Sequence, residues 1–385
     1  MNKNTKPFNL DPKQLDAFVN GMLRNEVKQY IKLKSQTHPK TILKENFIFS
    51  ISKEASKLYI QEIFNRKFQM RDDEMFSNKE IVAAITERHI FYSFKANDNE
   101  RLALQNNIEY KEKLIHETID DLIVNRYLGE VSYNVTTALY PPVSKIIVLN
   151  NLLYELFKTT NRVVNKDSKF IAIRNVFLRI IEQVKATSLL LDKYLIADAI
   201  SIWRGLYESE LTLVVLSYWD ESISKEYLDF TEFQLLERNI NLVDKTFEEV
   251  QEKLQKKAEF REVKVSNNFI HYGWLMQTSE FHDKKCKLNL KDGLAVVAEQ
   301  HVKYSSYQLA SNISHSPFFS KSLKEQQLLT YVVEMITYSL RTIFDSIINY
   351  LEESKLEINK DILNRFEKSQ QQLLDMIKVM EENAK

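Results

Sequence analysis

Glycine is so scarce in this chain that most folds built on tight turns are excluded. The 385 residues contain 5 glycines and 6 prolines, whereas average usage is roughly 7% and 5%. Hairpin turns, glycine-rich phosphate loops and the βα turns of doubly wound sheets all use glycine, because it adopts positive φ at no steric cost. The sequence therefore predicts an all-α fold, a multi-helix bundle.

Composition narrows the class of protein further. Hydrophobic residues make up 44% and charged residues 28% of the chain, which is typical of a globular protein. Lysine plus arginine and aspartate plus glutamate both number 53, so no global field attracts the chain to nucleic acid or an acidic membrane. The N-terminus is polar, and no apolar run reaches the ~18 residues that a membrane span needs. We expect a soluble, cytoplasmic protein with no membrane partner.

Two prolines suggest where the chain divides. The pair Pro141–Pro142 cannot lie inside a helix, so we predict an N-terminal helical region over residues 1–140 and a C-terminal bundle over 141–385. A short alternating run at Asn46–Ile51 could form a strand. Amphipathic helices are expected at Ser322–Glu353 and Asp361–Met380. Their apolar stripes predict a homo-oligomer, most simply a dimer.

The segment Tyr194–Trp219 is the most apolar helical stretch of the chain, and we expect most of it to be buried. Asp198, Ser201, Arg204 and Glu208 follow one another at spacings of three, three and four, which places them in one polar stripe on a helix. A buried arginine and glutamate must be paired, because an unpaired buried charge is costly. This stripe is the predicted centre of a site.

A later helix offers a second polar face. Tyr304, Gln308, Ser311 and His315 are spaced by four, three and four residues, and Pro317 ends the helix soon after His315. If the two helices pack together, Arg204 could clamp a phosphate, His315 could act as general acid or base, and Glu208 could orient either of them. The alternative is that Arg204 and Glu208 only tie helices together.

Other residues give weaker indications. His271 and His282 are interpreted as ordinary loop histidines. The single cysteine, Cys286, forms no intrachain disulfide, and the histidines lack ligand spacing, so no metal or cofactor is predicted. P-loop, dinucleotide-binding and α/β-hydrolase motifs do not occur.

Three segments carry a resemblance. ADAISIWRGLYE at Ala197–Glu208, the Tyr272-Gly273-Trp274 region and YQLASNISHSP at Tyr307–Pro317 together resemble a family of uncharacterised bacterial helical proteins, with an "A…R.L.E" helix and a later "Y..LS..vH" segment. The likeness covers about residues 143–350. The positions it highlights are Arg204, Glu208, Ser311 and His315. We take Tyr304, Tyr307, Ser311 and Asp198 as the binding candidates.

The chain also looks similar to HEPN-type proteins, many of which are RNases of toxin or phage-defence systems. Those proteins place an arginine and a histidine near each other on one helix, whereas Arg204 and His315 would have to meet from two helices. The resemblance implies a bacterial defence- or stress-associated protein that acts on or binds RNA or a nucleotide. The alternative is a non-catalytic helical scaffold that dimerises or docks a partner.

Overall fold

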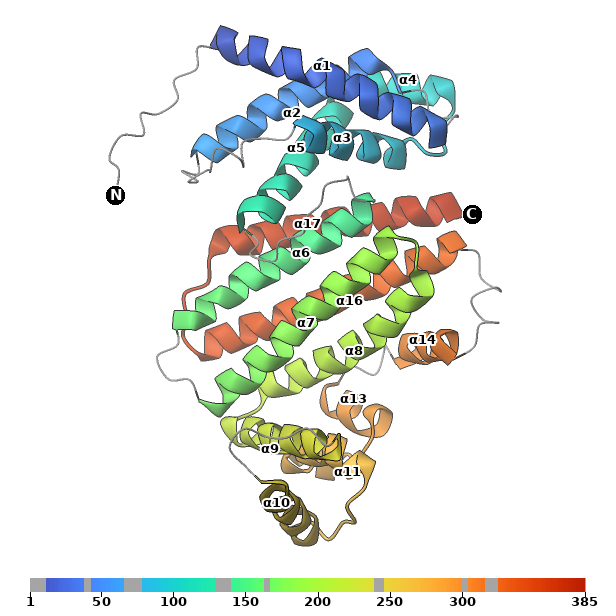
Figure 1. Cartoon of the computed structure of the whole chain (residues 1–385). Helices are drawn as coiled ribbons and strands as arrows, with labels where there is room; N and C mark the ends of the chain where they lie inside the picture. Colours follow the sequence, from blue (N-terminus) through green and yellow to red (C-terminus); the bar gives the residue numbers. More distant parts are fainter. Residues whose placement is uncertain are drawn as a thin grey trace, which may run out of the picture. The chain divides into compact units, whose positions relative to one another are not determined.

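The computed structural model of the chain is all-α, as the glycine content predicts. It describes residues 12–37, 43–65, 78–128, 140–162, 167–238, 246–299, 304–315 and 325–384, and within these ranges no strand occurs. None of the helices in the described ranges has the length and apolar character needed to cross a membrane. Figure 1 shows the helices in sequence order.

Contacts divide the chain into two compact units. The first contains residues 1–152 with 378–383 and 385, and the second contains residues 153–377 with 384. The boundary falls inside α6 (Pro141–Lys158), the helix whose first residue is the predicted start of the C-terminal region. The last helix, α17 (Lys360–Ala384), also has residues in both units.

The first unit buries one apolar core. Its other elements are α1 (Pro12–Thr37), α2 (Glu45–Asn65), α3 (Asn78–Tyr92), α4 (Asp98–Asn106), α5 (Ile108–Ile123) and the π-helical turn Val124–Leu128. The predicted strand at Asn46–Ile51 is wrong, because these residues lie within α2. Phe47, Ile48 and Ile51 are all buried, a spacing of one and three that matches a helical face.

A charged cluster also lies inside the first unit. Arg88 of α3 and Lys145 of α6 both donate to the carboxylate of Asp121 on α5, and Arg88 lies 3.8 Å from the carboxylate of Glu117. All four side chains are at most 3% exposed. The Tyr92 hydroxyl donates to Glu117 at 3.0 Å. Two cations thus neutralise two anions, as burial of these groups requires.

We predict that Asp121→Asn lowers the free energy of unfolding by about 3–5 kcal/mol, because it leaves two buried cations with one carboxylate between them. Urea unfolding followed by far-UV circular dichroism measures the loss. Glu112→Gln is the matched control, since Glu112 is exposed on the same helix and should change stability by less than about 0.5 kcal/mol. Equal stability of the two variants would contradict the role given to the cluster.

The second unit is organised around α8 (Ile196–Tyr218). Helices α7 (Ser168–Asp192) and α16 (Glu325–Glu353) lie along it, as Figure 1 shows. Trp203 is fully buried, and its indole Nε1 donates to the Ser339 hydroxyl of α16 at 3.2 Å. This face of α8 is apolar for the reason the sequence indicates: it packs against helices on two sides.

Shorter elements complete the second unit. They are α9 (Glu221–Glu237), α10 (Phe247–Phe260), α11 (Asn267–Tyr272), the 3₁₀ turn η4 (Gly273–Gln277), α12 (Ser279–Asp283), the π-helical turn η5 (Leu290–Leu294), α13 (Ala295–Val297) and α14 (Tyr304–His315). A 3₁₀ turn, η3 (Thr159–Arg162), follows α6. Residues 304–315 form α14, which packs on α8, so the condition set for the predicted site is met for these two helices.

The two long amphipathic stretches are helical and bury their stripes within the chain. The rings of Phe344 on α16 and Phe366 on α17 stack at a centroid distance of 3.9 Å, and Leu373 of α17 is fully buried. Such stripes favour self-association only where they lack a partner within the chain. Since they have one, a homo-oligomer stays a prediction without this support.

Candidate functional site

The polar stripe of α8 lies at the edge of its buried face. Asp198 and Ser201 are exposed, whereas Arg204 and Glu208 are half-buried. The expectation of a fully buried arginine–glutamate pair is therefore wrong. Trp203, Leu206 and Tyr207 occupy the buried face instead, so the four polar residues are left where solvent and other helices can reach them.

Tyr307 of α14 joins the two half-buried charges. Its hydroxyl donates to Glu208 Oε1 at 3.0 Å, and Arg204 Nη2 lies 3.5 Å from the same hydroxyl oxygen. The guanidinium carbon of Arg204 is 5.3 Å from the centre of the Tyr307 ring, a cation–π distance. Burial and the nearby Glu208 carboxylate raise the pKa of Tyr307, so the hydroxyl remains a donor at neutral pH.

The other predicted residues are only partly placed. Ser311 lies one turn after Tyr307 on α14 and is half-buried. Tyr304 and His315 begin and end α14, and their side chains lie outside the described part of the structure. The structure thus brings together Arg204, Glu208 and Tyr307. The roles of Asp198, Ser311, Tyr304 and His315 stay predictions.

Glu208 also lines a small polar cavity of about 140 Å³. Helices α7, α8, α9 and α11 and the turns that follow α11 all contribute to its wall. The lining residues used below are Arg179, Glu208, Tyr227, Arg238, His271, Tyr272 and Trp274. Tyr227, Tyr272 and Trp274 are aromatic, and Arg179, Arg238 and His271 are basic. The cavity lining thus combines aromatic rings with basic side chains.

The charges around the cavity favour an anion at its solvent side. Arg179 and Arg238 are exposed, whereas His271 and Glu208 are half-buried. The His271 imidazole Nε2 lies 3.5 Å from the Glu237 carboxylate. Two arginines and a histidine with an acidic partner thus surround one carboxylate that faces the cavity from α8.

The aromatic side of the cavity is firmly packed. The rings of Tyr227 and Trp274 meet edge to face at 5.2 Å, and the Trp274 indole donates to the His271 carbonyl oxygen at 3.1 Å. Burial raises the pKa of Tyr227, and burial followed by the Glu208 charge raises that of Tyr272. Both hydroxyls therefore stay protonated at neutral pH and can donate hydrogen bonds to a ligand.

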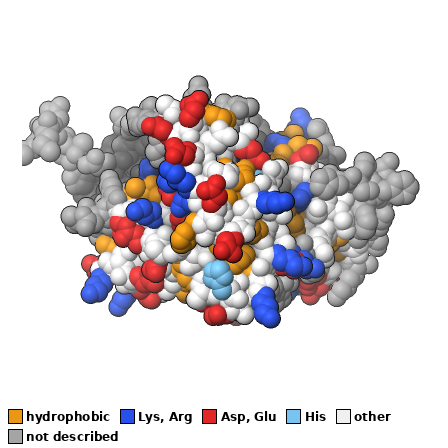
Figure 2. Space-filling view, turned by 90° about the horizontal axis from the view of Figure 1, so that it is seen from below, with side chains coloured by type: hydrophobic (Ala, Val, Ile, Leu, Met, Phe, Trp, Pro, Cys, Tyr) orange, Lys and Arg blue, Asp and Glu red, His pale blue; other side chains and the backbone are white. Residues whose placement is uncertain are grey.

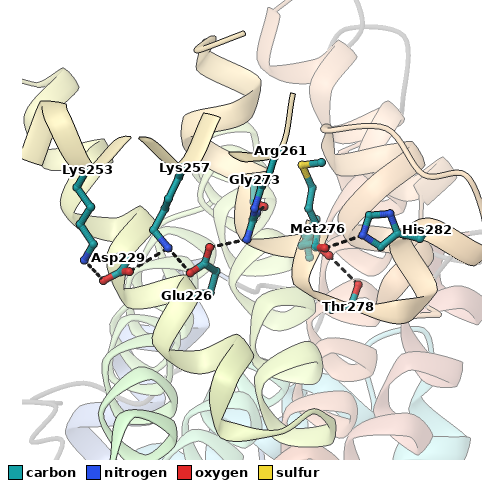
Figure 3. A network of polar contacts seen from close by, with 10 residues as sticks. Glu226, Asp229, Lys253, Lys257, Arg261, Gly273, Met276, Thr278 and His282 are labelled. Carbon is teal, nitrogen blue, oxygen red and sulfur yellow. Dashed lines mark hydrogen bonds and ion pairs between the residues drawn. The ribbon is translucent and has the colours of Figure 1, made fainter. Parts of the chain in front are cut away.

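A clamp from α10 fixes the backbone between Tyr272 and Trp274. Arg261 donates to the Gly273 carbonyl oxygen and to the Glu226 carboxylate of α9, as Figure 3 shows. Burial lowers the pKa of Arg261, while Glu226 opposes this shift. The side chain is 10% exposed, so the carbonyl bond is shielded from water. Arg261 therefore positions the cavity wall without lining the cavity.

Two lysines extend the same clamp. Lys253 and Lys257 of α10 both pair with Asp229 of α9, Lys257 at 3.2 Å, and Lys257 also donates to Glu226 (Figure 3). Burial raises the pKa of Asp229, but the hydrogen bonds from the two lysines outweigh it and hold that pKa below its usual value. This network fastens α10 to α9 and so supports the wall of the cavity.

Sequence reasoning missed most of this cavity. Arg179 and Arg238 were not singled out, and His271 was interpreted as a loop histidine, whereas it lies on α11 and lines the cavity. A usable signal was the position of Gly273, one of only five glycines, directly after a stretch that contains Phe269, His271 and Tyr272. Among the described residues, no group of three or more His, Cys, Asp or Glu side chains could hold a metal ion.

A comparison with known protein families matches residues 170–329 to a family of unknown function, DUF5677. The matched segment contains every residue named above as lining the cavity, as well as Arg204 and Tyr307. No curated protein and no solved structure is significantly similar to the chain. The match thus supports an uncharacterised family without assigning an activity to it.

We predict that Gly273→Ala lowers the free energy of unfolding of the second unit by about 1–3 kcal/mol, as overpacking does. A Cβ atom at Gly273 would lie 2.4 Å from Cε1 of Phe230 and 2.8 Å from Cδ2 of Phe269, two rings that cannot easily move. Denaturant unfolding followed by tryptophan fluorescence measures this loss, because Trp203, Trp219 and Trp274 all belong to the second unit.

Gly205→Ala is the control for that measurement. A Cβ at Gly205 would meet only Nε2 of Gln183 at 2.8 Å, the far end of a flexible side chain. Since alanine is favoured over glycine within a helix by roughly 0.5–1 kcal/mol, this variant should be as stable as the wild type or more so. A large loss in Gly205→Ala with none in Gly273→Ala would contradict the described packing.

Proposed function

We propose that residues 170–329 form a module that binds an anionic nucleotide, free or as part of a single-stranded RNA, at the cavity beside Glu208. The observation that carries the proposal is the grouping of Arg179, Arg238 and His271 around an aromatic-walled cavity. Arginine binds phosphate through charge-assisted, often bidentate hydrogen bonds. Aromatic walls suit an unstacked base. Proteins usually recognise single-stranded RNA by packing its unstacked bases against aromatic side chains.

The distribution of charge favours a small or single-stranded ligand over a long duplex. Basic and acidic residues are equal in number, and the face shown in Figure 2 carries acidic and basic side chains interspersed. Duplex binding relies on many phosphate contacts from a basic surface. A local group of arginines at one cavity is sufficient for one or two phosphates.

The chemical step of the proposal uses the residues predicted from sequence. Arg204 clamps the reacting phosphate, Glu208 orients Arg204 through the Tyr307 hydroxyl that both contact, and His315 acts as general acid or base. In α14, His315 follows Tyr307 by eight residues, about two turns of the helix. We place this activity in a bacterial defence or stress response because of the family resemblance alone, since the chain lacks the single-helix arginine–histidine pair of HEPN-type proteins.

Arg179→Ala should weaken binding of a nucleoside monophosphate by about 10- to 100-fold, the loss expected for a hydrogen bond to a charged group. Isothermal titration measures the affinity at low and at physiological salt. Arg174→Ala is the matched control, because Arg174 is also exposed on α7 but does not line the cavity. Equal weakening by both variants would mean that the ligand responds to overall charge and not to this site.

His315→Ala tests the chemical step separately. We expect it to abolish RNA cleavage and any growth inhibition on expression while the melting temperature stays unchanged, because a general acid or base acts in the transition state. RNA integrity, growth under phage challenge and thermal melts are compared for the wild type and the variant. A wild type that leaves RNA and growth untouched, or a variant that melts much earlier, would remove support for catalysis by His315.

A further inference from the structure

We propose that the cavity beside Glu208 selects guanine, with the Glu208 carboxylate accepting hydrogen bonds from the N1–H and N2–H groups of the base. This inference rests on the proposed function, since it concerns the ligand of the same site. It adds the identity of the base and gives Glu208 a role as the residue that determines specificity.

The size of the cavity limits what can enter. Its volume of about 140 Å³ is close to the ~150 Å³ of a cavity that holds one benzene molecule. One planar ring system with its edge inserted fits this space, whereas a whole nucleotide does not. The sugar and the phosphate must therefore stay on the solvent side, where Arg179 and Arg238 are exposed.

The hydrogen-bonding capacity of the Glu208 carboxylate distinguishes among the bases. An ionised carboxylate only accepts hydrogen bonds, and Tyr307 holds Oε1 in place at 3.0 Å. Guanine presents two adjacent N–H donors on its Watson–Crick edge, so both can point at one carboxylate. Adenine and cytosine present one donor beside an acceptor, and uracil presents one N–H between two carbonyl groups. Each of these three bases would set an acceptor against the carboxylate, which is unfavourable.

The remaining walls suit a flat ring with acceptors at its other edge. Tyr227 and Trp274 form a packed aromatic wall, and both line the cavity, where a flat base can contact them. The hydroxyls of Tyr227 and Tyr272 stay protonated because burial raises the pKa of each. They can therefore donate to the ring nitrogen and carbonyl acceptors of guanine.

The test is a calorimetric titration of the full chain with GMP, AMP, CMP, UMP and ribose 5-phosphate. We expect GMP to bind at least about 10-fold more tightly than the other nucleotides and than ribose 5-phosphate, the effect of one to two charge-assisted hydrogen bonds. Glu208→Gln should abolish this preference, because its amide puts a donor against the donors of guanine. Glu248→Gln, an exposed change on α10, should preserve it.

A second variant keeps the test decisive if Glu208→Gln does not fold. If thermal melts show that Glu208→Gln unfolds, Glu208→Asp keeps the charge but withdraws it from the base, and it should reduce the GMP preference in the same way. Ribose 5-phosphate binding as tightly as GMP, tighter binding of another nucleotide, or an unchanged preference in folded Glu208 variants would overturn the inference while leaving the anion site intact. No binding of any of the five ligands would overturn the proposed function itself.

Discussion

Burial of one face of α8 is the constraint on which the second unit depends. Trp203 and Tyr207 stack and are fully buried, and the Trp203 indole is tied to Ser339 of α16. Because this face is filled, the polar stripe from Asp198 to Glu208 lies along its edge. Arg204 and Glu208 lie at this edge, where Tyr307 of α14 contacts both side chains and Glu208 also lines the cavity. The same helix, α8, thus supplies both a face of the buried core and residues of the candidate site.

The cavity depends on a second set of contacts that lie outside it. Arg261 and Gly273 hold the turn between Tyr272 and Trp274, and the α9–α10 ion pairs hold Arg261. Gly273 is required by close approach to Phe230, not by an unusual φ. A site whose walls come from several short elements needs such support, because each element alone is too short to fix the position of a side chain.

Much of the fold follows from the sequence, and part of the site does. Glycine scarcity predicted an all-α chain, and the spacing of Arg204 and Glu208 placed both on one edge of α8. Spacing along a helix does not say which other helices approach it, so Arg179 and His271 could not be assigned to the cavity. The buried Arg88–Asp121 pair was missed for a related reason: charged residues on an amphipathic helix are usually solvated, and only tertiary packing encloses these.

A crystal structure of the protein with GMP would show whether the cavity beside Glu208 binds the base of a nucleotide. We expect guanine inside the cavity, with N1 and N2 about 2.7–2.9 Å from the Glu208 carboxylate oxygens, and the phosphate within reach of Arg179 or Arg238. GMP bound elsewhere, or with its phosphate inside the cavity and its base in solvent, would contradict this expectation.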